Sequence, residues 1–396
     1  MKILQVHNKY QNPGGEAVVV ASEYDLLTQS GDDVYQWIVH NDVIKDAGGL
    51  DKAKIALNSI WSSKSQQDIT KIITEFKPDV VHVHNTMPLL SPAIYSACHK
   101  AGVAVVQTLH NFRTICPGSP LYRDGHVCED CVGKSIPYPG MIHGCFRGSR
   151  AQSAITVANL SFNRFRGTYR NDIDVYVALT EFARNKFIAG GLPADKIMVK
   201  PNFVSADIEV GEHDGGYALF VGRLVPHKGI QAMVDAWRQL DTPIPLKVLG
   251  GGPLDTLLKE DVPEGIEFLG FVPREEVMGL MQNASLLLFP SEWYEGFPMT
   301  ITEAFATGLP VLAGGLGGPA EIVRDGESGW HFTPGDSTEM AQKLQEIWAD
   351  TDELKRRGQM ARQQFDDYYT PSKNYEILMD IYQTAINRFK QSVATR

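Results

Sequence analysis

Short apolar runs alternate with helix-like patterns through most of this 396-residue chain. A parallel sheet with helices on both faces produces this alternation, because its strands are buried on both sides and each crossover is a helix. The runs form two sets, which we interpret as the strands of two sheets: 3–6, 34–39, 80–83, 103–109 and 175–179, then 218–221, 246–249, 266–269, 286–289 and 311–313. We therefore expect an α/β protein with two Rossmann-like domains.

A linker separates the two sets of strands. Segment 200–207 and the acidic, Gly-rich segment 211–216 are rich in turn-forming residues. We expect an N-terminal domain over 1–203, a second domain over 204–370, and a helix over 371–396 that crosses back to the first domain. The two domains would face each other across a cleft.

Sequence and composition argue against three classes of protein. The chain has no stretch of about 18 consecutive apolar residues, and its first apolar run ends at once in Gln and Asn, so we expect neither a membrane span nor a secretory signal. A cytoplasmic protein is the expectation. A formal net charge of −10 argues against nucleic-acid binding, which needs a basic face.

Two glutamates indicate a nucleotide-sugar site. Glu295 follows the predicted strand that ends near Pro290, and Glu303 lies early in a helix predicted from Thr302 to Gly308. Ligands of open α/β sheets bind in such strand-to-helix loops, and a carboxylate accepts two hydrogen bonds from a diol. The alternative is an exposed loop glutamate and a helix-start glutamate favoured by the helix dipole.

Cations and glycines follow other predicted strands. Arg223 and Lys228 come after the strand that ends at Gly222, where they could neutralise a diphosphate, although ordinary surface charges are an equal alternative. Segment 12–16, with Gly14 and Gly15, follows the first strand and opens a helix. Such a place suits an anion or a plain tight turn. The glycines of 250–252 end another strand.

Together these motifs resemble the retaining glycosyltransferases of family 4, which have the GT-B fold. The resemblance covers nearly the whole chain, and its most specific parts are the spaced glutamates and the Gly-Arg-Leu followed by Lys-Gly. It implies that the N-terminal domain over 1–203 binds the acceptor and that the second domain over 204–370 binds the nucleotide-sugar donor. In the second domain, Arg223 and Lys228 would hold the donor diphosphate and Glu303 the ribose. Glu295, with the backbone of Gly296 and Phe297, would hold the donor sugar, and Gly222 would lie beside the phosphates.

The resemblance also assigns residues of the first domain. Gly15 would lie under the phosphates, and His110, at the end of the strand 103–109, matches the active-site histidine of the family. His82 and His84 match a further family pattern, and we interpret them as mainly structural. The alternative for His110 is a structural histidine that caps a strand end.

The implied reaction is transfer of a sugar from a nucleoside-diphosphate donor to a glycan or lipid-linked acceptor, with retention at the anomeric carbon, in cell-surface polysaccharide synthesis. No cofactor is implied for catalysis, and no acidic DxD-like pair stands in a suitable loop, which fits a metal-independent reaction. Charge stabilisation of the leaving diphosphate would carry most of the catalysis. Two alternatives stay open: a GT-B-like nucleotide-sugar epimerase and a nucleotide-sugar-binding protein without turnover.

A cysteine-containing insertion over about 112–148 departs from the simplest family pattern. Four cysteines, one pair spaced Cys-x-x-Cys, match a structural zinc site. A long loop without an apolar core needs a cross-link of this kind to become ordered. Reduced cysteines packed without metal and disulfides are the alternatives. The candidate ligands are Cys116, Cys128, Cys131 and Cys145, with His126 and His143 as substitutes, whereas Cys98 is expected in the core.

The same region is basic. No Asp or Glu occurs from Val132 to Asn171, and a basic amphipathic helix is predicted over 153–169. Segment 147–170 could contact the anionic inner face of a membrane, or the pyrophosphate of a lipid-linked acceptor. The alternative is a core helix whose arginines are solvated or paired. The cations are Lys134, Arg147, Arg150, Arg164, Arg166 and Arg170.

Overall fold

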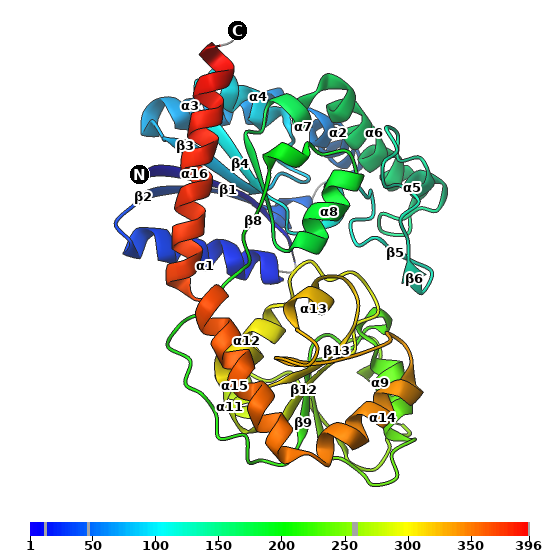
Figure 1. Cartoon of the computed structure of the whole chain (residues 1–396). Coiled ribbons are helices and arrows are strands. Elements are labelled where there is room, and N and C mark those ends of the chain that lie inside the picture. The colour runs from blue at the N-terminus through cyan, green and yellow to red at the C-terminus, as the bar shows by residue number, and fades with distance from the viewer. Residues whose placement is uncertain (12–13, 46–47, 256–259, 395–396) are drawn as a thin grey trace. The chain divides into compact units, whose positions relative to one another are not determined.

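The computed structural model describes residues 1–11, 14–45, 48–255 and 260–394. The chain forms two compact units (Figure 1). Unit 1 comprises Met1–Leu121, Glu129–Pro201 and Asn374–Arg396, and unit 2 comprises Tyr122–Cys128 and Asn202–Lys373. The chain therefore leaves unit 1 inside the predicted linker and re-enters it near the start of the last helix.

Unit 1 contains a six-stranded parallel sheet in the order β2-β1-β3-β4-β7-β8. The order reverses between β1 and β3, so the chain winds outward in both directions from these two strands. The central strands are buried along most of their length. The strands are β1 (Lys2–Lys9), β2 (Asp33–His40), β3 (Val80–Asn85), β4 (Ala104–Thr108), β7 (Val175–Ala178) and β8 (Ile197–Val199).

Helices cover this sheet. Helix α16 (Pro371–Ala394) packs Leu378, Ile381 and Tyr382 onto the core formed by the sheet and α1 (Gly15–Gln29). The apolar spacing of α16 places these three side chains on one face, which explains their complete burial. The other helices are η1 (Asn41–Ile44), α2 (Gly49–Ile60), α3 (Ser63–Phe76), α4 (Ala93–Lys100), α6 (Arg150–Arg166), α7 (Thr168–Asn171), α8 (Glu181–Ala189) and η3 (Ala194–Lys196).

The cysteine-containing insertion holds only short elements. It contains η2 (Phe112–Thr114), an antiparallel pair of strands β5 (Tyr122–Arg123) and β6 (His126–Val127), and α5 (Pro139–Ile142). Helix α6 follows it, and Gly167, with a φ of 81°, ends α6 in a left-handed cap.

Unit 2 contains a second six-stranded parallel sheet in the order β11-β10-β9-β12-β13-β14. The order reverses between β9 and β12. The elements are β9 (Ala218–Val221), η4 (Pro226–Lys228), α9 (Ile230–Trp237), β10 (Leu246–Leu249), β11 (Ile266–Gly270), α11 (Arg274–Asn283), β12 (Leu286–Phe289), α12 (Met299–Thr307), β13 (Val311–Gly314), α13 (Gly317–Ile322), β14 (Gly329–Phe332), α14 (Ser337–Trp348) and α15 (Thr351–Tyr368).

All ten predicted strands are present, and the expectation of two Rossmann-like α/β sheets is confirmed. The edge strands β8 and β14 were not predicted. Strand β8 has three residues and β14 begins with Gly329 and contains a histidine, so neither gives a clear apolar run. Helix α12 begins at Met299, earlier than predicted, and the predicted basic helix is α6 followed by the separate turn α7.

Candidate functional site

The candidate donor site lies at the point where the strand order of unit 2 reverses. Loops that follow β9 and β12 leave the same edge of the sheet there, and such switch points are where ligands of open α/β sheets bind. The two loops are joined by a hydrogen bond of 3.0 Å from the Glu292 backbone N–H to the His227 carbonyl. The predicted residues Lys228 and Glu295 stand on these two loops.

Three donors converge on one oxygen of Glu295. Lys228 Nζ lies 2.5 Å from Glu295 Oε1, Trp293 Nε1 2.6 Å and Ser291 Oγ 2.8 Å. Burial favours the protonated carboxyl, but the charge of Lys228 and the three hydrogen bonds outweigh it and hold the pKa of Glu295 below its usual value. Glu295 is thus a fixed, ionised carboxylate.

Glycines allow the loops of this site to touch. At Gly229 the φ angle is 72°, and a Cβ atom would come within 1.9 Å of the Pro290 carbonyl oxygen. At Gly250 the φ angle is 125°, and a Cβ atom would come equally close to the Gly222 carbonyl oxygen. A side chain at either position would therefore push the loops after β9, β10 and β12 apart.

The other predicted donor residues lie nearby in sequence but have different surroundings. Glu303, on α12, accepts a hydrogen bond of 3.0 Å from Arg274 Nη2, and burial raises its pKa although Arg274 opposes the shift. Arg223 is exposed. The Phe297 side chain packs against Tyr369, 5.8 Å between ring centres, which leaves its backbone for the role that the resemblance implies.

The loop from Glu295 to Gly296 also approaches α13. The Gly318 N–H donates to the Glu295 carbonyl at 3.3 Å, and a Cβ atom at Gly318 would come within 2.9 Å of the Gly296 carbonyl oxygen. This contact fixes the backbone on which the predicted sugar-binding role depends.

In unit 1, His110 follows β4 and contacts His84. The His84 Nδ1 and His110 Nε2 atoms are 2.9 Å apart, and the two rings stack with centres 5.2 Å apart. Burial lowers the pKa of His110 to about 3, so its imidazole is neutral near neutral pH. The hydrogen bond to His84 fixes the orientation of the ring.

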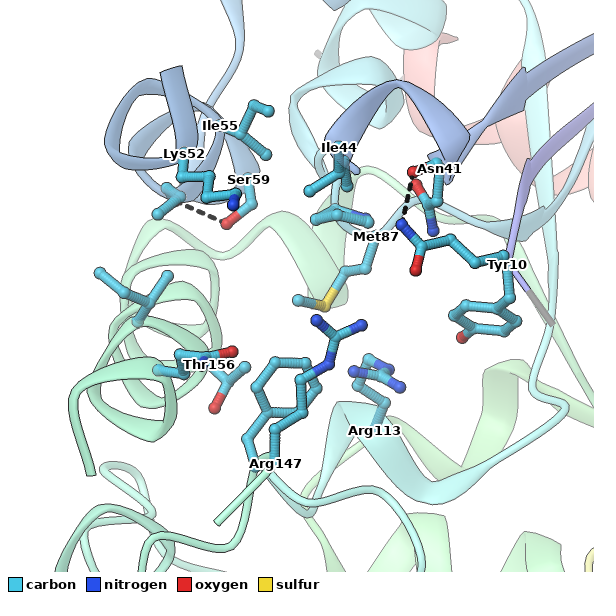
Figure 2. A pocket seen from close by; sticks show the side chains of 16 residues that line it. Tyr10, Asn41, Ile44, Lys52, Ile55, Ser59, Met87, Arg113, Arg147 and Thr156 are labelled. Carbon is cyan, nitrogen blue, oxygen red and sulfur yellow. Dashed lines mark hydrogen bonds between the residues drawn. The ribbon is translucent and has the colours of Figure 1, made fainter. Parts of the chain in front are cut away.

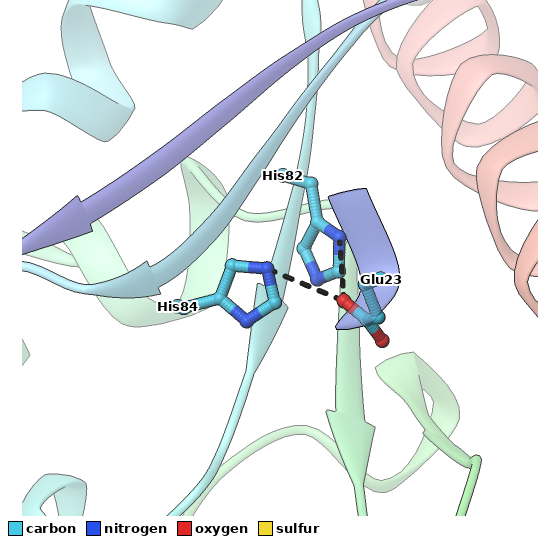
Figure 3. A group of neighbouring side chains, drawn as sticks. All are labelled: Glu23, His82 and His84. Carbon is cyan, nitrogen blue, oxygen red and sulfur yellow. Dashed lines mark ion pairs between the residues drawn. The ribbon is translucent and has the colours of Figure 1, made fainter. Parts of the chain in front are cut away.

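Behind His84 lies a group that we call the Glu23 cluster: Glu23, His82, His84, Lys200 and Asn374. Figure 3 shows Glu23 beside the two histidines, with Oε2 at 3.4 Å from His84 Nε2 and 3.9 Å from His82 Nδ1. Lys200 Nζ donates to Glu23 Oε1 at 2.6 Å and to Asn374 Oδ1 at 3.0 Å. The Glu23 and Lys200 side chains are fully buried.

Charge compensation explains how the Glu23 cluster tolerates burial. Burial alone would favour the protonated carboxyl, but Lys200 holds the pKa of Glu23 below its usual value. Both ring nitrogens of His82 are used, with Tyr382 Oη at 2.8 Å and Thr108 Oγ1 at 2.7 Å. Glu23, His82 and His84 are close enough to ligate a metal, and the Lys200 ammonium supplies a positive charge at the other oxygen of the Glu23 carboxylate.

The predicted phosphate-binding loop of unit 1 opens α1. Gly14 is the N-cap of α1 and Gly15 its first residue, while Asn12 and Pro13 lie outside the described residues. A Cβ atom at Gly15 would meet nothing within 4 Å, so the space above it is open. Burial raises the pKa of the next residue, Glu16, to about 8.

The zinc prediction for the insertion stays a prediction. Cys131 is buried, and Cys116, Cys128 and Cys145 are half-buried. Cys128 belongs to unit 2 and the other three to unit 1. The substitute ligands, His126 and His143, are exposed. Cys98 is fully buried in α4, as expected of a core residue.

The basic segment has two kinds of arginine. Arg164 donates to the backbone carbonyls of Lys134 and Thr114, so it holds the insertion onto α6. Arg166 instead lies over the Trp61 ring at 4.1 Å, and Phe165 next to it is 69% exposed. No helix among the described residues has the length and apolarity that a membrane crossing requires.

Sequence reasoning missed several residues of these sites. Ser291 and Trp293 stand beside Glu295 in sequence, and this proximity was a signal for both. Arg274 gave no signal, since its partner Glu303 lies on another helix. Glu23 and Lys200 resembled an ordinary surface glutamate and a linker lysine.

Comparisons with known proteins identify the family of the chain. Residues 10–208 match the family model described as Glycosyltransferase Family 4, and residues 207–364 match that described as Glycosyl transferases group 1. A Methanocaldococcus jannaschii protein named as an uncharacterized glycosyltransferase is 29% identical over 230 residues, which cover 55% of this chain and 62% of that relative.

Two further relatives extend the comparison. An amylovoran biosynthesis glycosyltransferase of Erwinia amylovora is 29% identical over 189 residues, 43% of this chain and 46% of the relative. The alignments thus span less than two thirds of the length of both curated relatives. The crystal structure of Anabaena HepE in complex with UDP has a TM-score of 0.68 and 19% identity, covering 97% of this chain and 100% of that one. This likeness confirms the expected GT-B fold.

Proposed function

Because the chain belongs to glycosyltransferase family 4, we propose that it transfers a sugar from a nucleoside-diphosphate sugar to a glycan or lipid-linked acceptor, with retention of the anomeric configuration and without a catalytic metal. The observation that carries the proposal is the Glu295 carboxylate, fixed by Lys228, Trp293 and Ser291 at the switch point of unit 2. A carboxylate held in this way is preorganised to accept hydrogen bonds from sugar hydroxyls.

The charges of unit 2 support the proposed chemistry. As the glycosidic bond breaks, negative charge gathers on the leaving diphosphate, so cations placed beforehand stabilise the transition state more than the ground state. Arg223 is exposed at the end of β9, and Lys228 follows it in η4. These two cations can neutralise a diphosphate directly, and addition of EDTA should therefore leave the rate unchanged.

The donor and the biological role are proposed from the relatives. HepE was crystallised with UDP and also with UDP-glucose, and the Erwinia relative is named for amylovoran biosynthesis. We infer a uridine-diphosphate sugar as the first donor to test and a polysaccharide or its lipid-linked precursor as the product.

One assay separates the proposed reaction from its two rivals. Candidate nucleotide sugars are mixed with the protein, with and without acceptor, and free nucleoside diphosphate and the intact donor are followed. Acceptor-dependent release supports transfer, and proton NMR of the new linkage should then show the donor's anomeric configuration. An altered but uncleaved donor would indicate epimerisation, and binding without any change would indicate a binding protein.

A matched pair of lysine variants tests the donor site. Lys228→Ala should lower donor affinity or turnover by roughly ten- to a hundred-fold, because a charge-assisted contact contributes about 1.5–3 kcal/mol. Lys355→Ala removes an exposed lysine from α15 of the same unit and should have no effect. If both folded variants transfer sugar at the parent rate, Lys228 does not hold the donor.

We also propose that segment 147–170 contacts the inner face of the cytoplasmic membrane. Exposed Phe165 and Arg166, next to each other at the end of α6, combine an apolar and a cationic side chain, as interfacial helices do. Sedimentation with phosphatidylglycerol vesicles tests this contact. Phe165→Ser should reduce co-sedimentation, and equal binding of both proteins would contradict the proposal.

A further inference from the structure

A chain of hydrogen bonds leads from the interior of unit 1 to His110. Gln5, on the strand β1, is 1% exposed, and its Nε2 atom lies 3.3 Å from His84 Nε2 on the neighbouring strand β3. The other ring nitrogen of His84, Nδ1, lies 2.9 Å from His110 Nε2. A neutral imidazole has a proton on one nitrogen and a lone pair on the other, so each hydrogen bond in this chain determines the next.

The first hydrogen bond has a fixed direction, because the orientation of the Gln5 amide is fixed. Gln5 Nε2 lies 3.2 Å from the Val20 carbonyl oxygen, which can only accept, so the atom at this position is the amide nitrogen. The amide oxygen accepts from Gln36 Nε2 at 2.6 Å, and Gln36 is opposite Gln5 in the register of β1 and β2. The second N–H of Gln5 therefore donates to His84 Nε2.

This donation determines the tautomers of both histidines. Burial lowers the pKa of His84, so its ring is neutral. Because Nε2 accepts from Gln5, the ring proton of His84 is on Nδ1, and Nδ1 donates it to His110 Nε2. The ring of His110 is also neutral, since burial lowers its pKa to about 3. With Nε2 as an acceptor, His110 carries its own proton on Nδ1.

The Glu23 carboxylate agrees with this assignment. Its Oε2 atom is 3.4 Å from His84 Nε2, yet it makes no hydrogen bond within the part of the chain that the structure describes. A proton on His84 Nε2 would be donated to this carboxylate, because charge-assisted hydrogen bonds are stronger than neutral ones. Glu23 therefore competes with Gln5 for His84. If the Gln5 amide is removed, the proton of His84 should move from Nδ1 to Nε2.

The Nδ1 atom of His110 is the ring nitrogen that remains for a ligand, because Nε2 contacts His84. His110 is half-buried and lines a cavity of about 60 Å³, which has room for a hydroxyl group or a water molecule. This cavity shares Met87 and Arg113 with a larger one of about 700 Å³, and Figure 2 shows both side chains in the larger cavity. All residues that line the two cavities belong to unit 1.

We propose that Gln5 and His84 are positioning residues that hold His110 with its proton on Nδ1. In this tautomer His110 donates a hydrogen bond to a substrate oxygen and does not take a proton from it. This inference rests on the proposed glycosyl transfer and adds the direction of the hydrogen bond that His110 makes in it.

Nitrogen NMR of the full chain, labelled only at histidine, tests the tautomers without any reaction. Protonated and unprotonated ring nitrogens resonate at well-separated frequencies, and the signals of His110 are identified by their loss in His110→Gln. In the parent protein, Nδ1 of His110 should be protonated and Nε2 unprotonated. In Gln5→Met, which keeps the length of the side chain, both His84 and His110 should carry the proton on Nε2, because Glu23 then accepts from His84.

A matched glutamine variant and the transfer assay complete the test. Gln66→Met makes the same change on α3, where Gln66 donates to the Ala93 carbonyl, and it should leave the histidine tautomers and the rate unchanged. Gln5→Met should lower kcat by about ten-fold, the contribution of one hydrogen bond, and should leave the affinity for UDP unchanged. A purely structural role of Gln5 would lower stability without a change of tautomer.

Three results would overturn the inference. One is a parent protein whose His110 is protonated on Nε2, another is a folded Gln5→Met variant with the tautomers of the parent, and the third is a variant with switched tautomers and the kcat of the parent. Failure of the parent to transfer any sugar would instead refute the proposed function. The NMR result distinguishes the two failures, because it does not depend on turnover.

Discussion

Removal of one charge from the Glu23 cluster gives the sharpest test of the structure. Lys200→Met keeps most of the side-chain length but deletes the ammonium that lies 2.6 Å from Glu23 Oε1. Both side chains are fully buried, so water cannot replace the lost partner without opening the core. The variant would leave the Glu23 carboxylate next to His82 and His84 without its cation.

The expected loss of stability is large. Removal of one partner from a buried ion pair costs about 3–5 kcal/mol, because an uncompensated charge stays in a medium of low polarity. Replacement of both partners by neutral groups is often close to neutral. We therefore expect Lys200→Met to be strongly destabilised, and the double variant Glu23→Gln/Lys200→Met to regain much of the loss.

Hydrogen exchange followed by mass spectrometry can locate the effect. At about 1.4 kcal/mol per factor of ten, the expected loss corresponds to roughly a hundred- to several-thousand-fold faster amide exchange where exchange reports the opening equilibrium. The acceleration should appear in peptides from β3 and α16. Peptides from β12 in unit 2 serve as the internal control.

The dependence on pH should also change sign. In the parent protein the pKa of Glu23 is lowered, so its contribution to stability is present above the unfolded pKa and is lost as the pH falls. Without Lys200, burial should raise that pKa above the unfolded value, and stability should then be lost as the pH rises. A loss below about 1 kcal/mol, or a double variant as unstable as the single one, would refute the account of a buried ion pair.

Other expectations concern single sites. Glu303→Ala should lower donor affinity or turnover by roughly ten- to a hundred-fold without unfolding the protein. Donor titration and kinetics measure the effect, and parent-like values would show that Glu303 does not belong to the donor site. We predict one zinc ion per chain in the insertion, and the double variant Cys128→Ser/Cys131→Ser should lose it. Metal analysis of the parent and of the variant checks this prediction. A metal-free parent protein with an ordered insertion would contradict it. The pKa of Glu16 is raised to about 8, so its contribution to the free energy of unfolding is complete below pH 4.5 and is lost as the pH rises toward 8. Thermal melts of Glu16→Gln should therefore show a smaller loss of stability between these two pH values. An unchanged pH profile of stability would show that Glu16 is not buried as a neutral acid.

The sheets could be predicted because burial on both faces gives the strands a continuous apolar signal. The loops after β9 and β12 could be placed at one edge from topology alone, which explains why the sequence predicts a shared site for Lys228 and Glu295. Their direct ion pair could not be predicted, because backbone topology does not determine which side chains meet.

The interior charges could not be predicted for a different reason. Lys200 stands in a segment of turn-forming residues, where a lysine is normally solvated, and its partner Glu23 lies 177 positions away. A third contributor, Asn374, belongs to the last helix. Local sequence holds no information about such a cluster, because its members are polar residues of ordinary types that burial alone makes unusual.

A hydrogen bond of 2.6 Å from Asn374 Nδ2 to the Pro201 carbonyl joins the two places where the chain leaves and re-enters unit 1. The chain leaves unit 1 after Pro201 and returns to it at Asn374, so the main segment of unit 2, Asn202–Lys373, is an insert whose two flanking residues are hydrogen-bonded to each other. An inserted domain of this kind can be removed or replaced without a change in the fold that carries it, because a short connection is enough to join the two flanking residues. Joining residue 201 to residue 374 by a short glycine-containing link should give a separate unit 1 that keeps its six-stranded sheet. The second unit of a relative could then be grafted onto unit 1.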